Sequence, residues 1–454
     1  LIKLINGGSA PNQNSDMLSA DYNFPSNTTP ANVQLFPAAY YLDIDGDAKK
    51  DLLVSPNANN VSENENSVWF YKNLSSNQGP VFAFQDNDWL QGDMIEHGAG
   101  SRPVLADLNQ DGLLDLLVGN FHAYKPVLNK ESRIAYYQNI GTASAPAFIL
   151  VDNNFLDLAN SGLGLNFMPS VGDLNNDGKP ELIIGRDNGQ LALYLNTTAG
   201  STPSFTLQTS ILTDASGSSI QVPMFASPQL FDLNEDGKQD LIIGYKGGGL
   251  IYYENTGSTT NPLFTLQSSA LGSINVAVNG PDGFSNAWFF KWQDTTYLLV
   301  GAQDGRIHFF DSISNNILGA YHEITADLVG LSVQIGAYAS ASVGNLDNDA
   351  HLDLIVGQDL GGLFYLEDQP GSDLGLQDHQ QIGIRVYPNP FSNSFSVQID
   401  GAHELRAGLY DLNGLLLAEF EFHQGLQTVA LPQLKTGIYF LSFSDGQVLK
   451  MVKQ

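Results

Sequence analysis

The sequence contains no cysteine, which excludes disulfide bonds and thiolate metal sites. Basic residues are scarce: 19 Lys and Arg stand against 48 Asp and Glu, and the formal net charge is −29. Such a surface repels a phosphate backbone, so we expect no nucleic-acid partner. No apolar run approaches the roughly 18 residues of a membrane helix, so we expect no transmembrane segment. No signal peptide or initiator methionine is visible at Leu1, so we expect the chain to begin inside a longer or processed protein.

What the sequence does contain is an acidic repeat. The segment "DLNQDGLLDLLVGN" begins at Asp107, and related segments begin at residues 43, 173, 232 and 345. The first four starts are 59 to 66 residues apart and the last interval is 113 residues, which predicts a hidden copy between them. "TYLLVGAQDGRIHFF" at 296–310 is that copy: its strand pattern survives, but the acidic residues are missing.

Each repeat predicts four short strands. An apolar strand precedes the acidic loop and a Leu-rich or β-branched strand follows it. An alternating strand and a strand after a Pro-containing turn complete the unit. Four antiparallel strands in about 60 residues are typical of one propeller blade, and such blades bury their faces only by packing on one another. We therefore predict an all-β fold with a propeller over residues 1–368, which holds six inner hairpins.

The two ends of the predicted propeller are incomplete. Residues 1–24 have the pattern of the outer two strands of a blade, and the last repeat lacks a fourth strand. Either the chain is part of a longer repeat array, or the N-terminal strands close the ring against the last blade. The two alternatives are compatible.

The pattern changes after residue 368. Residues 369–381 are polar without strand periodicity and predict a linker. Residues 382–454 alternate in short strands and predict a small Ig-like β-sandwich. Only five of the 19 basic and six of the 48 acidic residues lie in 382–454, so the excess negative charge belongs to the propeller.

The acidic loops predict calcium sites. Oxygen-bearing side chains fall at loop positions 1, 3, 5 and 9, and a glycine at position 6 permits a tight turn. Several hard oxygen ligands on a flexible loop suit Ca²⁺ better than Mg²⁺. The predicted side-chain ligands are Asp43, Asp45, Asp47 and Asp51; Asp107, Asn109, Asp111 and Asp115; Asp173, Asn175, Asp177 and Glu181; Asp232, Asn234, Asp236 and Asp240; and Asn345, Asp347, Asp349 and Asp353. The predicted position-7 backbone carbonyls are those of Lys49, Leu113, Lys179, Lys238 and His351.

These loops could serve catalysis or calcium sensing, or each could hold a structural ion. Five nearly identical copies favour five structural ions, because an active site is rarely repeated in every blade. We expect no ion at 289–297, where Phe289, Lys291, Gln293 and Tyr297 align with positions 1, 3, 5 and 9. The loops with Ala48 and with Ala350, where others have glycine, should bind more weakly.

The pattern D-x-[DN]-x-D-G-x-x-D-L-[LI]-[VI]-G resembles the FG-GAP/VCBS repeat family over residues 1–368. The resemblance implies calcium-bearing propeller blades, as in integrin α-subunit heads and many bacterial surface proteins. That family includes adhesins, lectins and carbohydrate-active enzymes.

The tail resembles the type A sorting domain of the type IX secretion system, in "VYPNPFSNSFSVQI", "LYDLNGLLL" and "LKTGIYFLSFSDGQVLKMVKQ". The residues that carry the family's motifs are Tyr387, Pro388, Asn389, Pro390, Gly437, Tyr439, Lys450 and Lys453. The resemblance implies export across the outer membrane of a Bacteroidetes-type bacterium. It also implies that the secretion translocon and outer-membrane shuttle proteins are partners of residues 382–454. The alternative is that the tail is an ordinary Ig-like module.

The sequence shows no H-E-x-x-H, G-x-S-x-G or phosphate-binding glycine motif. We therefore expect a secreted or cell-surface binding or adhesion module without enzymatic activity. Its glycan or protein ligand would contact the variable loops at 55–67 and 120–132. The alternatives are a polysaccharide-degrading enzyme on a propeller scaffold and a structural component of a surface assembly.

Overall fold

The computed structural model describes residues 1–8, 15–33, 36–58, 62–92, 94–125, 129–278, 280–324, 336–349, 351–366, 383–400, 405–410, 415–423, 425–443 and 448–453. Two compact units divide the chain, Leu1–Leu374 and Gly375–Gln454. The division lies within the predicted linker 369–381, whose residues are outside the described ranges.

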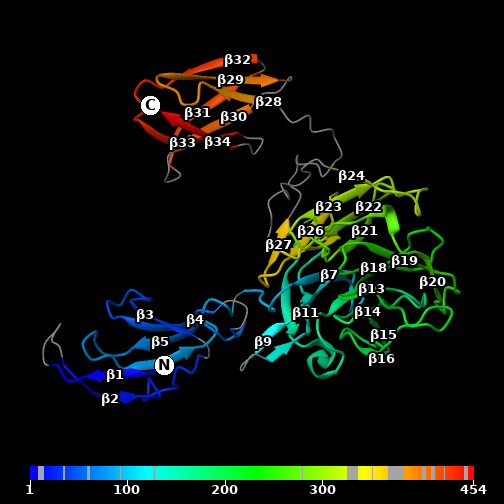
Figure 1. The fold of residues 1–454 in the computed structure, drawn as a ribbon, viewed down its shortest axis with the longest axis horizontal. Coiled ribbons are helices and arrows are strands. Elements are labelled where there is room, and N and C mark those ends of the chain that lie inside the picture. The colour runs from blue at the N-terminus through cyan, green and yellow to red at the C-terminus, as the bar shows by residue number, and fades with distance from the viewer. Residues whose placement is uncertain are drawn as a thin grey trace. The chain divides into compact units, whose positions relative to one another are not determined.

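The first unit consists of antiparallel sheets, six of which begin with the hairpin of one repeat (Figure 1). We number these sheets blades 1 to 6 in chain order. Blade 1 is β3 (Pro37–Leu42), β4 (Asp51–Pro56), β5 (Trp69–Asn73) and β6 (Phe82–Asp86). Blade 2 is β7 (Arg102–Ala106), β8 (Asp115–Gly119), β11 (Ile134–Asn139) and β12 (Phe148–Asp152). Blade 3 is β13 (Met168–Gly172), β14 (Glu181–Gly185), β15 (Leu191–Asn196) and β16 (Phe205–Thr209).

The remaining blades repeat this order. Blade 4 is β17 (Ser227–Phe231), β18 (Asp240–Gly244), β19 (Leu250–Asn255) and β20 (Phe264–Ser268). Blade 5 is β21 (Asn286–Trp292), β22 (Thr295–Gly301), β23 (Ile307–Asp311) and β24 (His322–Ile324). Blade 6 is β25 (Ser340–Gly344), β26 (Asp353–Gly357) and β27 (Leu363–Leu366). The six predicted inner hairpins are confirmed.

Smaller elements complete this unit. Strands β1 (Lys3–Asn6) and β2 (Met17–Asp21) pair with each other. Strands β9 (Ala123–Lys125) and β10 (Asn129–Glu131) form a hairpin inserted into blade 2. Two short 3₁₀ helices, η2 (Phe155–Asn160) and η3 (Leu271–Ser273), follow the outer strands of blades 2 and 4.

Blades 2 to 6 form a closed ring. Their inner strands pack in order from β7 through β13, β17 and β21 to β25, and β25 packs back on β7. Hydrogen bonds hold this last contact, including Leu105 N–H to Ser342 Oγ at 3.1 Å. The contact between blades 6 and 2 therefore closes the ring. One of the two alternatives above, closure by the N-terminal strands of residues 1–24, is wrong.

A glycine at the end of each second strand makes the closed ring possible. A Cβ at any of them would lie 2.1 or 2.2 Å from a carbonyl oxygen of the next blade, where real Cβ atoms stay beyond 3.0 Å. The glycine and carbonyl pairs are Gly119 and Phe167, Gly185 and Ala226, Gly244 and Ser285, Gly301 and Ala339, and Gly357 and Ser101. The last pair returns to the start of blade 2, so the circle contains five blades.

Blade 1 departs from this rule. Ser55 takes the position of the ring glycines, since it pairs with Ala38 as Gly119 pairs with Arg102. The inner strand β3 exposes Tyr40, Tyr41 and Leu42 by 50%, 41% and 43%, whereas β7 is mostly buried. The closed ring therefore excludes the first repeat, which has a core of its own around Tyr71 and Phe82.

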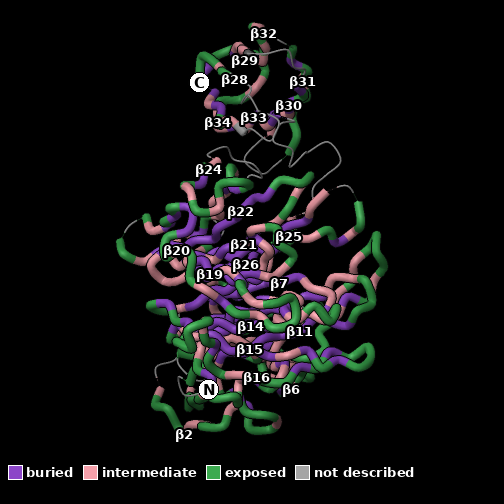
Figure 2. The backbone as a smooth tube through the Cα atoms, turned by 90° about the vertical axis from the view of Figure 1, so that its right-hand side faces the viewer, coloured by how far each residue is buried: buried purple, intermediate pink, exposed green. Residues whose placement is uncertain are grey.

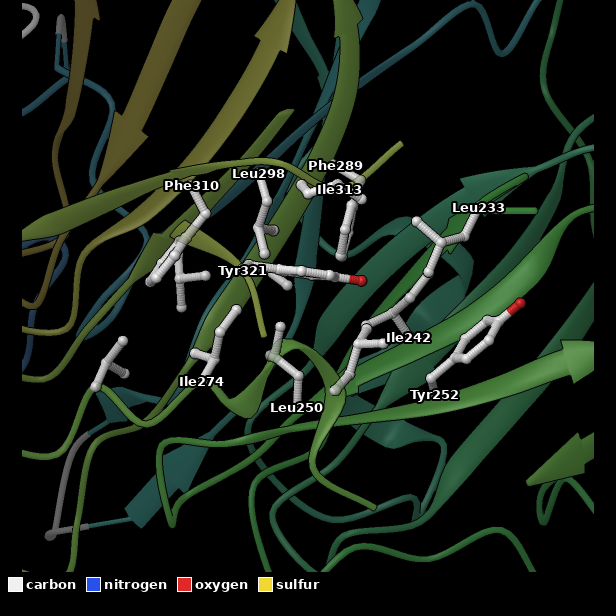
Figure 3. Packing of buried hydrophobic residues seen from close by; sticks show 14 of the residues in the cluster. Leu233, Ile242, Leu250, Tyr252, Ile274, Phe289, Leu298, Phe310, Ile313 and Tyr321 are labelled. Atoms are coloured by element: carbon white, nitrogen blue, oxygen red, sulfur yellow. The ribbon is translucent and has the colours of Figure 1, made fainter. Parts of the chain in front are cut away.

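The burial pattern follows the ring, because inner and second strands are buried and outer strands are exposed (Figure 2). Apolar clusters form between neighbouring blades rather than inside one sheet. Figure 3 shows the cluster between blades 4 and 5, which includes Ile242 and Tyr252 from blade 4 and Phe289, Leu298 and Tyr321 from blade 5. Burying such side chains contributes about 1.5–3 kcal/mol each before entropic costs, so blade pairing stabilises the fold.

Aromatic side chains fill the centre of the ring at the end where the inner strands begin. Two residues before their inner strands, Phe225, Phe284 and Tyr338 adopt left-handed backbone conformations with φ of 56°, 48° and 55°. Phe121 joins them, with its ring centroid 5.0 Å from that of Tyr338. We call these four residues the aromatic floor. The buried Arg102 lies against it, 4.5 Å from the Phe121 ring centroid.

The second unit is a sandwich of two antiparallel sheets, as predicted. One contains β28 (Gly383–Tyr387), β29 (Ser394–Asp400) and β32 (Gly425–Ala430). The other contains β31 (Leu416–Phe422), β30 (Leu405–Tyr410), β33 (Gly437–Phe443) and β34 (Val448–Lys453). Phe395, Val397, Leu409 and Leu441 are fully buried between them.

We predict that Gly244→Ala destabilises the ring, because the new Cβ would clash with the carbonyl oxygen of Ser285. The melting temperature should fall by about 5–10 °C, corresponding to about 2–3 kcal/mol of overpacking. Gly200→Ala is the matched control, since nothing lies within 4 Å of its Cβ position. Equal melting temperatures for the two variants in a thermal scan would contradict the closed ring.

Candidate metal centres

Each acidic loop ends in a buried carboxylate at the first residue of the second strand. These position-9 residues are Asp51, Asp115, Glu181, Asp240 and Asp353. In blade 4 one oxygen of Asp240 accepts the Leu233 N–H at 3.2 Å, and the other accepts the Asn255 N–H at 2.8 Å. The hydrogen bond from the backbone N–H of loop position 2 to the position-9 carboxylate recurs in all five loops. The position-9 carboxylate therefore links its loop to the second strand, and in blades 1, 2 and 4 also to the third.

Tyrosine hydroxyls from the third strand complete this contact in three blades. Tyr136 donates to Asp115 at 3.1 Å, Tyr252 to Asp240 at 2.9 Å and Tyr365 to Asp353 at 2.9 Å. By register, blade 1 has Phe70 and blade 3 has Leu193 in this position.

Among the described residues, no ion pair reaches the position-9 carboxylates. Burial raises the pKa of Asp115 and of Asp240 to about 6, against the lowering effect of their hydrogen bonds. Burial likewise raises the pKa of Glu181 and Asp353. A buried carboxylate without a counter-charge is costly, so a bound cation would relieve this cost.

The loop coils around its position-1 side chain. In blade 2, Asp107 accepts the Asp111 N–H at 3.2 Å and the Gly112 N–H at 2.9 Å. Asp111 accepts the Leu113 N–H at 2.9 Å. Blades 3 and 4 repeat these three hydrogen bonds. In blade 6, Asn345 instead donates its side-chain amide to the Asp349 carbonyl at 2.7 Å.

Two left-handed residues produce the coil, whereas the sequence predicted one. In blade 2 they are Gln110 at position 4, with φ of 63°, and Gly112 at position 6, with φ of 87°. In blade 1 they are Gly46 and Ala48, with φ of 77° and 67°. The glycine has moved from position 6 to position 4, and Ala48 itself adopts the left-handed conformation of position 6. Ala350 of blade 6 lies outside the described residues.

The chemistry of these loops fits a hard cation. Positions 1, 3, 5 and 9 offer only oxygen as acceptor. In blade 1, oxygens of Asp43, Asp45 and Asp51 lie within 4.8 Å of one another. The position-7 residues donate their N–H groups to position 5 in every loop. That their carbonyls face the ion remains a prediction.

Blade 5 has no such loop, but its alignment differs from the one expected. Strands β21 and β22 are joined by a tight turn at Gln293 and Asp294, both left-handed. Asn286 pairs with Gly301 as Ser227 pairs with Gly244, so Phe289 corresponds to Leu230 and not to Asp232. The hairpin is two residues shorter than the others, which the sequence alignment on Gly301 alone did not reveal. Phe289 is a buried core residue.

Sequence reasoning missed an asparagine near the end of the repeat. Asn139 closes the third strand of blade 2; its N–H donates to Asp115 at 2.9 Å, and its Oδ1 accepts the Gly141 and Ala147 N–H groups at 3.0 Å. Asn73 and Asn255 do the same in blades 1 and 4. Its recurrence in "FYKN", "YYQN", "LYLN" and "YYEN" was the available signal.

The sorting-motif residues are brought together at one end of the sandwich. Asn389 donates to the Lys450 carbonyl at 2.6 Å and accepts the Val452 N–H at 2.9 Å. Lys453 is buried, with its ammonium 5.8 Å from the Phe391 ring centroid. Gly437 pairs with Lys453, and Tyr439 is buried. Tyr387 is exposed, and it is the last residue of β28, directly before Pro388. Pro390 precedes the buried Phe391, which is not among the predicted motif residues.

Two families match separate parts of the chain. Residues 42–118 match the FG-GAP-like repeat, and residues 385–454 match the secretion system C-terminal sorting domain. Integrin alpha-4 of Xenopus laevis is 28% identical over 150 residues, which are 32% of this chain and 14% of that protein. The chain thus carries an FG-GAP-like repeat and a type IX secretion tail, and it matches about one-seventh of the length of this curated relative.

Two solved structures show distant likeness. One is a glycoside hydrolase family 43 arabinoxylan arabinofuranohydrolase from Bacillus subtilis, with TM-score 0.38 and 11% identity over 79% of this chain and 94% of that one. The other is AofleA from Arthrobotrys oligospora, with TM-score 0.35 and 10% identity over 89% and 91%. Likeness at this level does not bear on activity or ligand.

The sorting tail directs export by type IX secretion to the cell surface or the medium. Within the ranges that the structure describes, no helix has the length and apolar character needed to cross a membrane.

We predict that calcium raises the melting temperature and that Asp111→Asn weakens this effect. The variant keeps an acceptor for the Leu113 N–H but removes one charge from the second loop. Calcium affinity of that loop should fall by about tenfold, measured by calorimetric titration after chelator treatment. Asp16→Asn, at an exposed carboxylate outside the loops, should leave the titration unchanged. An unaltered titration of Asp111→Asn would exclude this loop as a site.

Proposed function

We propose that this chain is a secreted, calcium-stabilised propeller that binds a glycan or protein ligand at the cell surface and performs no catalysis. The export rests on the sorting tail. The binding role is supported chiefly by the aromatic floor of Phe121, Phe225, Phe284 and Tyr338, which lies at the opposite end of the inner hairpins from the acidic loops.

The floor is held in a strained conformation. Bulky residues rarely adopt a positive φ, which costs of order 1–3 kcal/mol each. Phe225, Phe284 and Tyr338 all do so, and all three are half-buried. Such strain is concentrated at functional sites. Half-buried aromatic rings offer an apolar surface suited to the face of a sugar ring or to an apolar side chain.

The longest loops between second and third strands contact each other at this same end of the hairpins. Tyr124 donates its N–H to Asn64 Oδ1 at 2.8 Å, and Lys125 pairs with Glu65 at 3.4 Å. Arg133 also pairs with Glu65. Asn64 and Glu65 belong to the predicted variable loop 55–67, and Tyr124 and Lys125 to the loop 120–132, which Arg133 directly follows. The two predicted variable loops therefore contact each other.

In this proposal the loop oxygens at positions 1, 3, 5 and 9 hold Ca²⁺ at the other end of the hairpins. The ion would supply the positive charge that the buried position-9 carboxylates lack. The loop backbone already wraps the position-1 side chain, so the chain's own hydrogen bonds orient the ligands and the ion fixes the first strand to the second.

The tail implies contact with the type IX secretion machinery. We propose that the translocon and outer-membrane shuttle proteins contact residues 382–454, with Asn389 positioning the last strand.

We predict that Phe225→Ala together with Phe284→Ala lowers ligand affinity by at least about tenfold, because each aromatic ring contributes about 1–1.5 kcal/mol of stacking. The full chain would be screened on an array of glycans and matrix proteins, and the variant retested on each hit. Phe364→Ala, at a ring on β27 that is 44% exposed, is the control. Undiminished binding by the floor variant would place the ligand elsewhere.

One observation favours the alternative of a polysaccharide-degrading enzyme. Burial raises the pKa of Glu96 to about 7, although the Gly98 N–H at 2.8 Å favours its charged form. The Glu96 carboxylate lies beside Gly361, and Gly361 is in the turn between the second and third strands of blade 6, at the floor end. A carboxylic acid with a pKa near neutrality can act as a general acid.

Glu96→Gln separates the two functions. An enzyme would lose turnover, measured as new reducing ends from a polysaccharide panel, whereas a binding module would produce none in either form. The folded pKa is above the ordinary 4.5, so wild-type stability falls as pH rises between these values. Between about pH 5 and pH 8 the wild-type melting temperature should therefore fall more than that of the variant. Parallel pH profiles would contradict the burial argument.

A further inference from the structure

One residue of the third strand differs in charge among blades 1 to 4, and in blades 1 and 4 its side chain contacts the acidic loop. It immediately precedes the asparagine that contacts position 9. By strand register it is Lys72 in blade 1, Gln138 in blade 2, Leu195 in blade 3 and Glu254 in blade 4. We call this the gate position.

The gate side chain reaches loop position 3. In blade 1 the Lys72 ammonium donates to Asp45 Oδ2 at 2.5 Å. In blade 4, Glu254 accepts the side-chain amide of Asn234, also at position 3, at 3.3 Å. One structural position thus brings a positive charge to the first loop and a negative charge to the fourth.

Lys72 lies among the predicted calcium ligands of its loop. Asp45 is one of the three residues whose oxygens converge within 4.8 Å. The hydrogen bond from Lys72 lowers the pKa of Asp45, and Asp47 and Asp51 add to the electrostatic stabilisation of the Lys72 ammonium. The other loops have a neutral Asn at position 3 in blades 2, 3 and 4. The extra acid of blade 1 is therefore accompanied by its own cation.

We propose that Lys72 is a built-in cation that competes with calcium at the first loop, so that this loop is folded without the ion and binds it more weakly than the loops of blades 2 to 4. The proposal rests on calcium binding by those other loops. Calcium must displace the ammonium from Asp45 to use that oxygen, and a unit charge at about 5 Å from a divalent ion reduces affinity by about tenfold even in water.

The two nearby lysines differ from Lys72. Lys49 pairs with Asp47, at loop position 5, at 3.6 Å. The Lys50 ammonium lies 5.7 Å from the Tyr41 ring centroid. Lys50→Gln therefore removes the same charge as Lys72→Gln without touching the Asp45 contact, and is the matched control.

Hydrogen–deuterium exchange of the full chain, followed by mass spectrometry across a calcium titration, resolves each loop. In the wild type, peptides over 43–51 should be protected without calcium and change little. Peptides over 107–115, 173–181 and 232–240 should gain protection as calcium is added. With Lys72→Gln, the first loop should lose protection without calcium and regain it with calcium at an affinity about tenfold higher. Lys50→Gln should behave as wild type.

The reciprocal variant tests the gate position itself. Gln138→Lys places an ammonium opposite loop position 3 of blade 2, and should lower calcium affinity at 107–115 by about tenfold while leaving 173–181 unchanged. If Lys72→Gln and Lys50→Gln give the same titration, or Gln138→Lys has no effect, the proposed competition between the gate residue and calcium is wrong. If no loop gains protection with calcium in any variant, calcium binding itself is wrong, which is a separate outcome.

Discussion

The five-bladed ring depends on how closely the backbone of one blade approaches that of the next. Each second strand ends in a glycine whose Cβ position is taken by a carbonyl oxygen of the following blade. This approach brings the inner strands close enough for apolar clusters to form between blades, and those clusters supply most of the buried core. The presence of this glycine also distinguishes the repeats that join the ring from the one that does not. Where Ser55 replaces glycine, the repeat folds as a blade but lies outside the ring.

A second requirement opposes the first. Tight packing between blades excludes water from the start of each second strand, yet that position carries a carboxylate. The carboxylate is satisfied by backbone N–H groups and, in three blades, by a tyrosine hydroxyl, but these neutral donors do not cancel its charge. Blade 5 avoids the conflict, because its hairpin is shorter and the buried Tyr297 stands where the other blades have the position-9 carboxylate. Blade 1 reduces the charge of its exposed loop with Lys72.

The repeat spacing and strand alternation were sufficient to predict the blades, their inner hairpins and the sandwich, because both patterns reflect local backbone geometry. The spacing also predicted the acidic loop between the first two strands, and that its side chains bind calcium stays a prediction. Which blades join into a ring was not, since it depends on contacts between residues far apart in sequence, such as Gly357 with Ser101. The two-residue deletion in blade 5 was hidden because the alignment used a single glycine. The aromatic floor was also missed: Phe225, Phe284 and Tyr338 lie in connections without periodicity, and their left-handed conformation leaves no mark on the sequence.

The acidic loops and the aromatic floor occupy opposite ends of the same inner hairpins, separated by strands of five residues or more. In the proposed function, stability and surface recognition therefore draw on different segments of each repeat. Substitutions in the connections at the floor leave the loop hydrogen bonds untouched, so this end of the ring can diversify between related proteins while the loops stay constant. An antibody domain is arranged in a similar way, with a constant scaffold that carries loops of variable specificity at one end.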